Sequence, residues 1–255
     1  MRKTRAVQVK HVQIGGGAPV AIQSMTKTDT ANVDETVRQI EEMVSAGCEI
    51  VRLAVPDNDA ALALKEIRKR VPEVPLVADI HFHYKLALMA LEAGIDKLRL
   101  NPGNIGKHER IVEVVRAAQA QKVPIRIGVN GGSLEKDLLK KYGTATPEAM
   151  VESAMRHIGI LEDLDFTDII ISLKASDVHR TVAAYRQSGI EMEARSYDGV
   201  ARFFRGMDLI EPGIVAIDDW HAGGVTPDLP EGVRALDTAV SAPPAAGYAA
   251  VGRKR

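Results

Sequence analysis

The chain has 255 residues, 45% of them hydrophobic and 26% charged, which is enough for one large or two small domains with a buried core. Its formal net charge of -1 gives no general attraction to nucleic acids or anionic membranes, so an anion would have to bind at a local site. Cys48 is the single cysteine, which excludes an internal disulfide and a multi-cysteine metal site within these residues and favours a cytoplasmic location. The sequence shows neither an apolar signal core nor the ~18 apolar residues of a membrane span, so we expect neither export nor insertion.

From Pro19 to about Arg186, short apolar runs alternate with longer segments of helical period, a rhythm typical of βα units and a parallel sheet. In the first helix, Asn32 can cap the start and Gly47 marks the end. The expected strands cover residues 20–24, 50–55, 76–80, 97–101, 125–130 and 168–174, and the later helices cover residues 59–70, 84–93, 109–121 and 147–164. A complete TIM barrel needs eight strands and ~250 residues, so these six units predict an incomplete, TIM-barrel-like α/β fold.

One face of the predicted strands is polar, because alternate residues of a strand share a face. The opposite face is uniformly apolar and should pack beneath the helices. Two segments, AGCEIVRL at 46–53 and AGIDKLRL at 93–100, repeat one pattern and place arginines at equivalent strand positions. The polar face carries Arg52, Asp79, His81, Arg99, Asn101, Arg126, Gly128, Asn130, Ser172 and Lys174.

Arg52, Arg99, Arg126 and Lys174 would repel one another inside a barrel unless something negative offset them. One explanation is a buried ion-pair network centred on Asp79. The carboxylates on this face are too few for that, however, and the pattern favours a site for phosphate or diphosphate, which guanidinium groups bind in a forked geometry. These residues lie toward the C-terminal ends of their strands, where barrel enzymes keep their active sites.

The remaining polar motifs have ordinary structural explanations beside functional ones. The turns NPGN at 101–104 and NGGS at 130–133 offer amide donors, although each composition is also typical of a plain turn. Ser133 is a candidate cap for a helix that follows. His81 and His83 point to opposite faces of one strand, so a shared metal ion is not expected.

After Arg186 the rhythm ends, and the remaining residues contain one lysine and several Pro and Gly motifs. We therefore predict a barrel domain over residues 1–186 and a different, irregular α+β tail over residues 187–255. Within the tail the sequence favours a short helix at 199–205, two strands at 207–211 and 214–218, and a flexible loop at 222–245.

Residues 5–186 resemble the N-terminal barrel of the 4-hydroxy-3-methylbut-2-enyl diphosphate synthase family. The matching motifs are AIQSMT at 21–26, IVRLAVP at 50–56, PLVADIHF at 75–82, LRLNPGNIG at 98–106, PIRIGVN at 124–130, GSLEKD at 132–137, ESAMRH at 152–157 and KASDV at 174–178. The resemblance implies a role in the methylerythritol phosphate route to isoprenoids: the reductive ring opening of 2-C-methyl-erythritol 2,4-cyclodiphosphate, with ferredoxin or flavodoxin as electron donor. It implies that Arg52, Arg99, Asn101, Arg126, Asn130 and Lys174 bind the diphosphate, with Asp79 and His81 near it.

The family's reaction also uses a [4Fe-4S] cluster, which three cysteines and one glutamate hold in a separate domain. Residues after Arg186 do not match that domain, and Cys48 is the single thiol, so we expect that this chain by itself cannot hold the cluster. The ring opening is therefore expected to be incomplete or absent in this chain. Family members share active sites between protomers, which allows a homo-oligomer.

Residues from about 195 to 255 resemble the C-terminal end of actinobacterial S-adenosylmethionine-dependent methyltransferases. The similarity is carried by VARFFRGMDLIEPG at 200–213, the region of Trp220 and YAAVGRK at 248–254. The Gly-rich cofactor turn of that fold is not in this sequence. Three alternatives thus stay open: a non-catalytic diphosphate-binding module, a methyltransferase fragment, and, by fold analogy, a pterin-binding barrel of the dihydropteroate synthase type.

Overall fold

The computed structural model describes residues 4–81, 83–100, 108–175, 178–187, 207–216 and 248–254. The chain divides into two compact units, Met1–Ser176 and Asp177–Arg255. This division lies shortly before the domain boundary predicted at residue 186. The assignment of a barrel domain and a methyltransferase-like tail stays a prediction.

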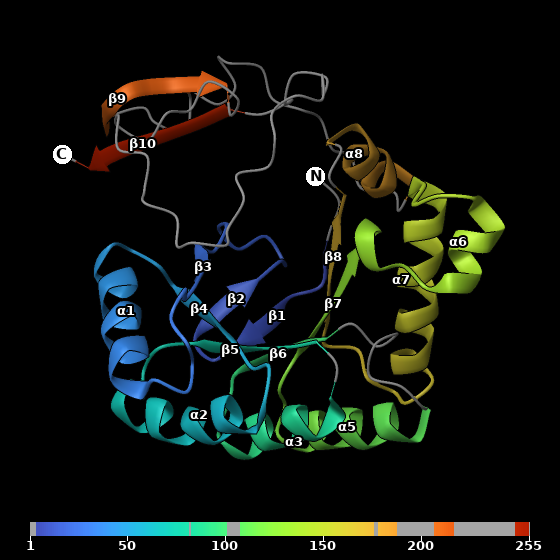
Figure 1. Ribbon diagram of the computed structural model, residues 1–255, viewed down its shortest axis with the longest axis horizontal. Coiled ribbons are helices and arrows are strands. Elements are labelled where there is room, and N and C mark those ends of the chain that lie inside the picture. The colour runs from blue at the N-terminus through green and yellow to red at the C-terminus, as the bar shows by residue number, and fades with distance from the viewer. Residues whose placement is uncertain are drawn as a thin grey trace, which may run out of the picture. The chain divides into compact units, whose positions relative to one another are not determined.

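A six-stranded parallel sheet is the centre of the first unit, with its strands in chain order (Figure 1). The strands are β3 (Gln23–Met25), β4 (Ile50–Ala54), β5 (Leu76–Ile80), β6 (Lys97–Leu100), β7 (Ile125–Asn130) and β8 (Ile169–Lys174). The sheet curls, and β3 and β8 are its two edges, which confirms the incomplete barrel. The predicted strands agree closely, except that β3 begins three residues later than expected.

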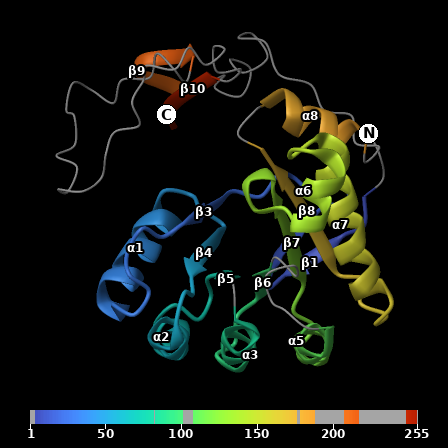
Figure 2. The same ribbon diagram turned by 45° about the vertical axis from the view of Figure 1, so that its right-hand side comes forward.

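Helices cover the outer, convex side of the sheet, and Figure 2 shows α2, α3 and α5 side by side there. The helices of this unit are α1 (Val33–Ser45), α2 (Asn58–Arg70), α3 (Tyr84–Glu92), α5 (His108–Ala120), α6 (Lys136–Tyr142) and α7 (Pro147–Glu162). The Asn32 side chain accepts a hydrogen bond from Glu35 N at the start of α1, as predicted. The apolar strand face packs beneath the helices: Val51, Leu53, Leu98 and Ile125 have no exposed surface.

Two short elements beside the sheet differ from the expectation. A hairpin of β1 (Val7–Val9) and β2 (Val12–Ile14) was not predicted, because two three-residue runs are too short for a clear pattern. Its Val9 and Val12 pack against Ile50 and Val77, near the N-terminal ends of β4 and β5. Ser133 does not cap a helix, since it belongs to the short 3-10 turn η1 (Gly131–Ser133) and α6 begins three residues later.

The second unit contains α8 (Val178–Gln187) and an antiparallel pair, β9 (Met207–Ala216) and β10 (Tyr248–Lys254). The prediction of two strands within residues 207–218 is wrong, because β9 is one strand. Its proline and glycine lie where the register shifts, at a bulge opposite Ala249–Val251, so they do not end the strand. The predicted helix at 199–205 and loop at 222–245 lie outside the described residues. None of the helices described has the length and hydrophobicity needed to cross a membrane.

Candidate functional site

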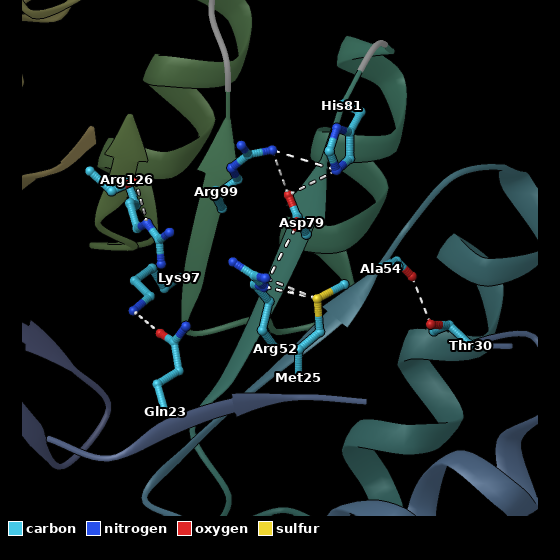
Figure 3. Close-up of polar contacts among 11 residues, drawn as sticks. Gln23, Met25, Thr30, Arg52, Ala54, Asp79, His81, Lys97, Arg99 and Arg126 are labelled. Carbon is cyan, nitrogen blue, oxygen red and sulfur yellow. Dashed lines mark hydrogen bonds and ion pairs between the residues drawn. The ribbon is translucent and has the colours of Figure 1, made fainter. Parts of the chain in front are cut away.

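Asp79 connects three polar side chains on the concave face of the sheet (Figure 3). Its carboxylate is buried, with Oδ1 3.0 Å from Arg99 Nη1 and Oδ2 3.6 Å from Arg52 Nε. His81 Nε2 lies 3.4 Å from Oδ1. The strand register explains this meeting, because Asp79 is the Cα partner of Arg99 on β6 and lies one strand from β4. Four of the predicted site residues therefore form one contact network.

Met25 on β3 also contacts the Arg52 guanidinium. Its Sδ atom lies 3.2 Å from Arg52 Nε and 3.0 Å from Nη2. Met25 is the register partner of Arg52 on the neighbouring strand. The predicted strand ended at residue 24, one residue before Met25, and the sequence gave no reason to link this methionine with the site, because a methionine there is most often a core residue.

Gly128 on β7 provides the space that the Arg99 guanidinium occupies. A Cβ atom at residue 128 would lie 2.7 Å from Arg99 Nε and 2.9 Å from Nη2, closer than such atoms can approach. Arg99 Nε is buried, and no hydrogen-bond partner lies near it among the described residues. A glycine inside a strand can signal close approach of another group, so the sequence contained a sign of this role.

Arg126 stands beside Arg99 on the adjacent strand, where the two residues are Cα partners. Its Nε atom donates a hydrogen bond to Ser172 Oγ on β8 at 3.2 Å. Like charges at directly opposite positions of two strands are destabilising. The pair is therefore a place where a bound anion would lower the electrostatic free energy.

Lys97 is the charged residue of the concave face that sequence reasoning missed. The side chain is 1% exposed and Nζ donates a hydrogen bond to Gln23 Oε1 at 2.9 Å. Burial, together with the charges of Arg126 and Arg52, lowers the pKa of Lys97 from 10.5 to about 8. Lys97 lies two residues before Arg99, and residues so spaced share one face of a strand. This spacing could have predicted that Lys97 belongs to the polar face.

Asn130 and Lys174 lie at the rim, as Cα partners at the C-terminal ends of β7 and β8. The Asn130 side chain accepts a hydrogen bond from Gly132 N at 3.1 Å, which fixes the turn that follows β7. Four residues separate Asn130 from Arg126, or ~13 Å along an extended strand. The rim pair is thus above the Asp79 network and not part of it. Asn101 lies outside the described residues.

The concave face carries more positive than negative charge. At the inward strand positions that the structure describes, five cations share the face with one carboxylate, Asp79: they are Arg52, Lys97, Arg99, Arg126 and, at the rim, Lys174. The ion-pair network considered from the sequence is therefore real, but it does not balance the charge. Within the same described part of the chain, no three His, Cys, Asp or Glu side chains are grouped so that they could hold a metal ion.

A second buried polar cluster anchors the segment after the rim turn. Glu135 Oε1 lies 2.7 Å from His157 Nε2 and accepts a hydrogen bond from Ser153 Oγ at 3.1 Å. Burial lowers the pKa of His157 below its usual value, against the opposing effect of the Glu135 charge. Burial therefore favours the neutral imidazole, and the cluster connects Glu135, which precedes α6, to α7.

Comparisons with known proteins agree with the motifs. Residues 4–201 match the model of the GcpE TIM-barrel domain. Two relatives carry the name 4-hydroxy-3-methylbut-2-en-1-yl diphosphate synthase (flavodoxin). The one from Thermodesulfovibrio yellowstonii is 62% identical over 185 residues, 72% of this chain and 53% of that protein. The one from Symbiobacterium thermophilum is 57% identical over 199 residues, 78% of this chain and 54% of that protein.

The chain spans about half the length of these curated relatives. Among solved structures, the dihydropteroate synthase of Vibrio fischeri is similar in fold, with a TM-score of 0.50 and 13% identity over 73% of this chain and 76% of that one. At this identity the likeness concerns the fold alone. The match of the family model to most of the chain, together with relatives that are about 60% identical, identifies the chain as a member of the GcpE family, the 4-hydroxy-3-methylbut-2-en-1-yl diphosphate synthases.

Proposed function

We propose that the concave face binds 2-C-methyl-erythritol 2,4-cyclodiphosphate, the substrate-binding step of diphosphate synthase chemistry in isoprenoid biosynthesis. The observation that carries the proposal is the excess of positive charge among the described inward residues, with Asp79 as the one carboxylate. A cyclic diphosphate supplies two negative charges on one small ligand. Guanidinium groups bind such oxygens through paired, charge-assisted hydrogen bonds.

Within this proposal the predicted site residues have different roles. Arg99 and Arg126, which stand side by side, bind phosphate oxygens, and Arg52 adds a third guanidinium. Asp79 orients Arg52 and Arg99 and does not itself contact the anion, because a carboxylate and a phosphate repel each other. His81 is half exposed at the edge of this network, where it faces the substrate.

Asn130 and Lys174 are proposed to bind the substrate from the rim, where a long lysine side chain can reach the diphosphate. We propose the same role for Asn101, on the resemblance to the family.

The electron-transfer part of the family's chemistry does not fit the residues of this chain. A [4Fe-4S] cluster needs three thiolates besides its glutamate, and the sequence supplies Cys48. That thiol is buried and donates to Ile50 O at 3.2 Å. No electron-transfer step is therefore assigned to this chain, and we propose that it binds the cyclodiphosphate without reducing it. For the whole enzyme, flavodoxin is the proposed electron donor because the relatives' names include it, with ferredoxin as the alternative.

Calorimetry with the cyclodiphosphate tests the binding proposal. Loss of one charged hydrogen-bond donor costs ~1.5–3 kcal/mol, so Arg99→Ala should weaken binding by that amount. An affinity unchanged by Arg99→Ala would refute the site assignment. Anaerobic reconstitution with iron and sulfide tests the second part: absorbance of an iron-sulfur cluster would contradict the claim that this chain cannot hold one.

The resemblance of residues 195–255 to a methyltransferase C-terminus stays a prediction. The described strands there, β9 and β10, form an antiparallel pair. Measurable affinity for S-adenosylmethionine would favour that alternative over diphosphate binding. A homo-oligomer and a cytoplasmic location likewise stay predictions of the sequence.

A further inference from the structure

Lys97 lies one inward position before Arg99 on β6 and level with Arg52, at a place where a charge is costly. It is 1% exposed and is the largest fully buried side chain among the described residues. Its partner is an amide, Gln23 Oε1 at 2.9 Å, and no described carboxylate lies within ion-pair distance of its ammonium group. Buried lysines without an ionic partner are rare, because desolvation of the ammonium is not offset.

The hydrogen bond from Lys97 to Gln23 also crosses the concave face. The two residues lie on β6 and β3, three strands apart, or ~14 Å in a flat sheet. Side chains stand roughly perpendicular to a sheet, so such a pair meets because the sheet curls toward it. Figure 3 shows the Lys97 side chain directed toward Gln23, with Arg126 above it and Arg52 on β4.

Three groups act on Lys97 directly: Gln23 of β3 accepts its hydrogen bond, and the charges of Arg126 on β7 and Arg52 on β4 oppose its own. The other polar and charged groups of the same face contact these arginines or Arg99: they are Met25 of β3, Asp79 of β5 and Ser172 of β8. The carboxylate of Asp79 is already engaged by Arg52 and Arg99. Burial and the charges of Arg126 and Arg52 lower the pKa of Lys97 to about 8. Its proton is therefore weakly held at a pH only slightly above neutral.

We propose that Lys97 is a positioning residue of the anion site whose protonation is coupled to ligand binding: a diphosphate seated against Arg52, Arg99 and Arg126 draws a proton onto Lys97. The inference rests on the proposed function. An added dianion offsets the repulsion between the ammonium group and the arginines, so the protonated form is favoured in the complex. A lysine that only ties β3 to β6 would bind the same number of protons with and without ligand.

The cyclodiphosphate is a suitable probe because it does not itself titrate in the relevant range. Each of its phosphates is esterified and joined in a ring, so it lacks the second phosphate proton, which a monoester loses near pH 6. Any proton taken up on binding between pH 7 and 9 therefore enters the protein. Inorganic pyrophosphate would confuse the measurement by its own titration.

Calorimetric titration of the full chain, in two buffers of different ionisation enthalpy, counts these protons. We expect an uptake of about half a proton per ligand at pH 8 and of nearly none at pH 6.5. We also expect the affinity for the ligand to fall by up to about tenfold per pH unit above pH 8. Lys97→Met should abolish the uptake. Lys97→Arg, which keeps a permanent charge, should bind without it. Lys65→Met, at an exposed position of α2, is the matched control and should keep the uptake.

Binding without proton uptake at pH 8 in the wild-type chain would refute the role of Lys97 and leave diphosphate binding intact. Uptake that persists in Lys97→Arg would assign the proton to another group and refute it as well. If Lys97→Met fails to fold, the wild-type pH series and Lys97→Arg still test whether the proton taken up on binding enters Lys97. An absence of binding at pH 7 would refute the proposed function itself, and this inference with it.

Discussion

Gly128→Ala tests the geometry of the site by adding one methyl group against the Arg99 guanidinium. The new Cβ would lie 2.7 Å from Arg99 Nε and 2.9 Å from Nη2, so the guanidinium must leave its place. It would thereby lose the 3.0 Å contact of Nη1 with Asp79 Oδ1. The substitution should therefore act on ligand binding through Arg99, although residue 128 itself has no side chain to offer.

The expected magnitude follows from what Arg99 loses. One charged hydrogen bond to the ligand is worth ~1.5–3 kcal/mol, which corresponds to a Kd about 10- to 150-fold higher. In the free protein, the lost contact with Asp79 outweighs the ~0.5–1 kcal/mol that alanine gains over glycine in a regular element. Calorimetry with the cyclodiphosphate measures the first effect and urea unfolding the second.

Gly159→Ala is the matched control, because it is the same substitution where the structure leaves open space. Apart from the neighbouring backbone of α7 itself, no described atom lies within 4 Å of a Cβ at residue 159. This variant should be ~0.5–1 kcal/mol more stable and should bind the ligand with unchanged affinity.

A double-mutant cycle gives the decisive result. If Gly128→Ala acts by displacing Arg99, adding it to Arg99→Ala should weaken binding little further. Additive effects of the two substitutions, or an affinity for Gly128→Ala within twofold of wild type, would refute the reasoning.

Two further predictions concern buried ionisable groups. Asp79→Asn should lower the free energy of unfolding by about 3 kcal/mol, because it leaves two largely buried arginines without their counter-charge. Urea titration measures this loss. A loss below about 1 kcal/mol would mean that solvent screens the network. The pKa of His157 is lowered in the folded state, so the unfolded chain binds the proton more tightly. The stabilisation linked to neutral His157 is therefore fully present at a pH above the pKa of His157 in the unfolded chain. It is lost as the pH falls through the pKa of His157 in the folded protein. His157→Gln should flatten the decrease in unfolding free energy below pH 6.5, and an unchanged slope would show that other groups cause it.

The alternation of apolar and helical segments predicted most of the barrel, because each βα unit has a strong local pattern. β5 and β7 have the predicted bounds, and α1 starts at the predicted cap. The hairpin β1–β2 was missed because its strands are only three residues long. In β9, the proline and glycine indicated a break, but the long-range pairing with β10 accommodates them in a bulge. Pairing between distant segments is the information that a local pattern does not contain.

The face of each site residue was predictable from strand parity, but its partners were not. Arg52, Asp79, Arg99 and Arg126 point to the concave side as expected. Which arginine reaches the carboxylate depends on register and on the curl of the sheet. Gly128 and Gln23 gain their roles only through contacts with Arg99 and Lys97, residues on other strands. The roles of the eight predicted site residues as substrate ligands stay predictions until binding is measured.

The strands that carry Arg126 and the Asp79 network are not the edges of the sheet. Arg52, Asp79, Arg99 and Arg126 lie on β4 to β7, and each of these strands is paired on both sides. The edge strands β3 and β8 contribute the neutral partners Gln23, Met25 and Ser172, and β8 also carries Lys174 at the rim. The contacts described for these side chains lie within the six strands, so the positive surface is assembled without closing the barrel. Under the proposed function, anion binding and reduction are separable: binding would use the arginines of these strands, and reduction needs three thiolates, whereas Cys48 is the single cysteine of this sequence.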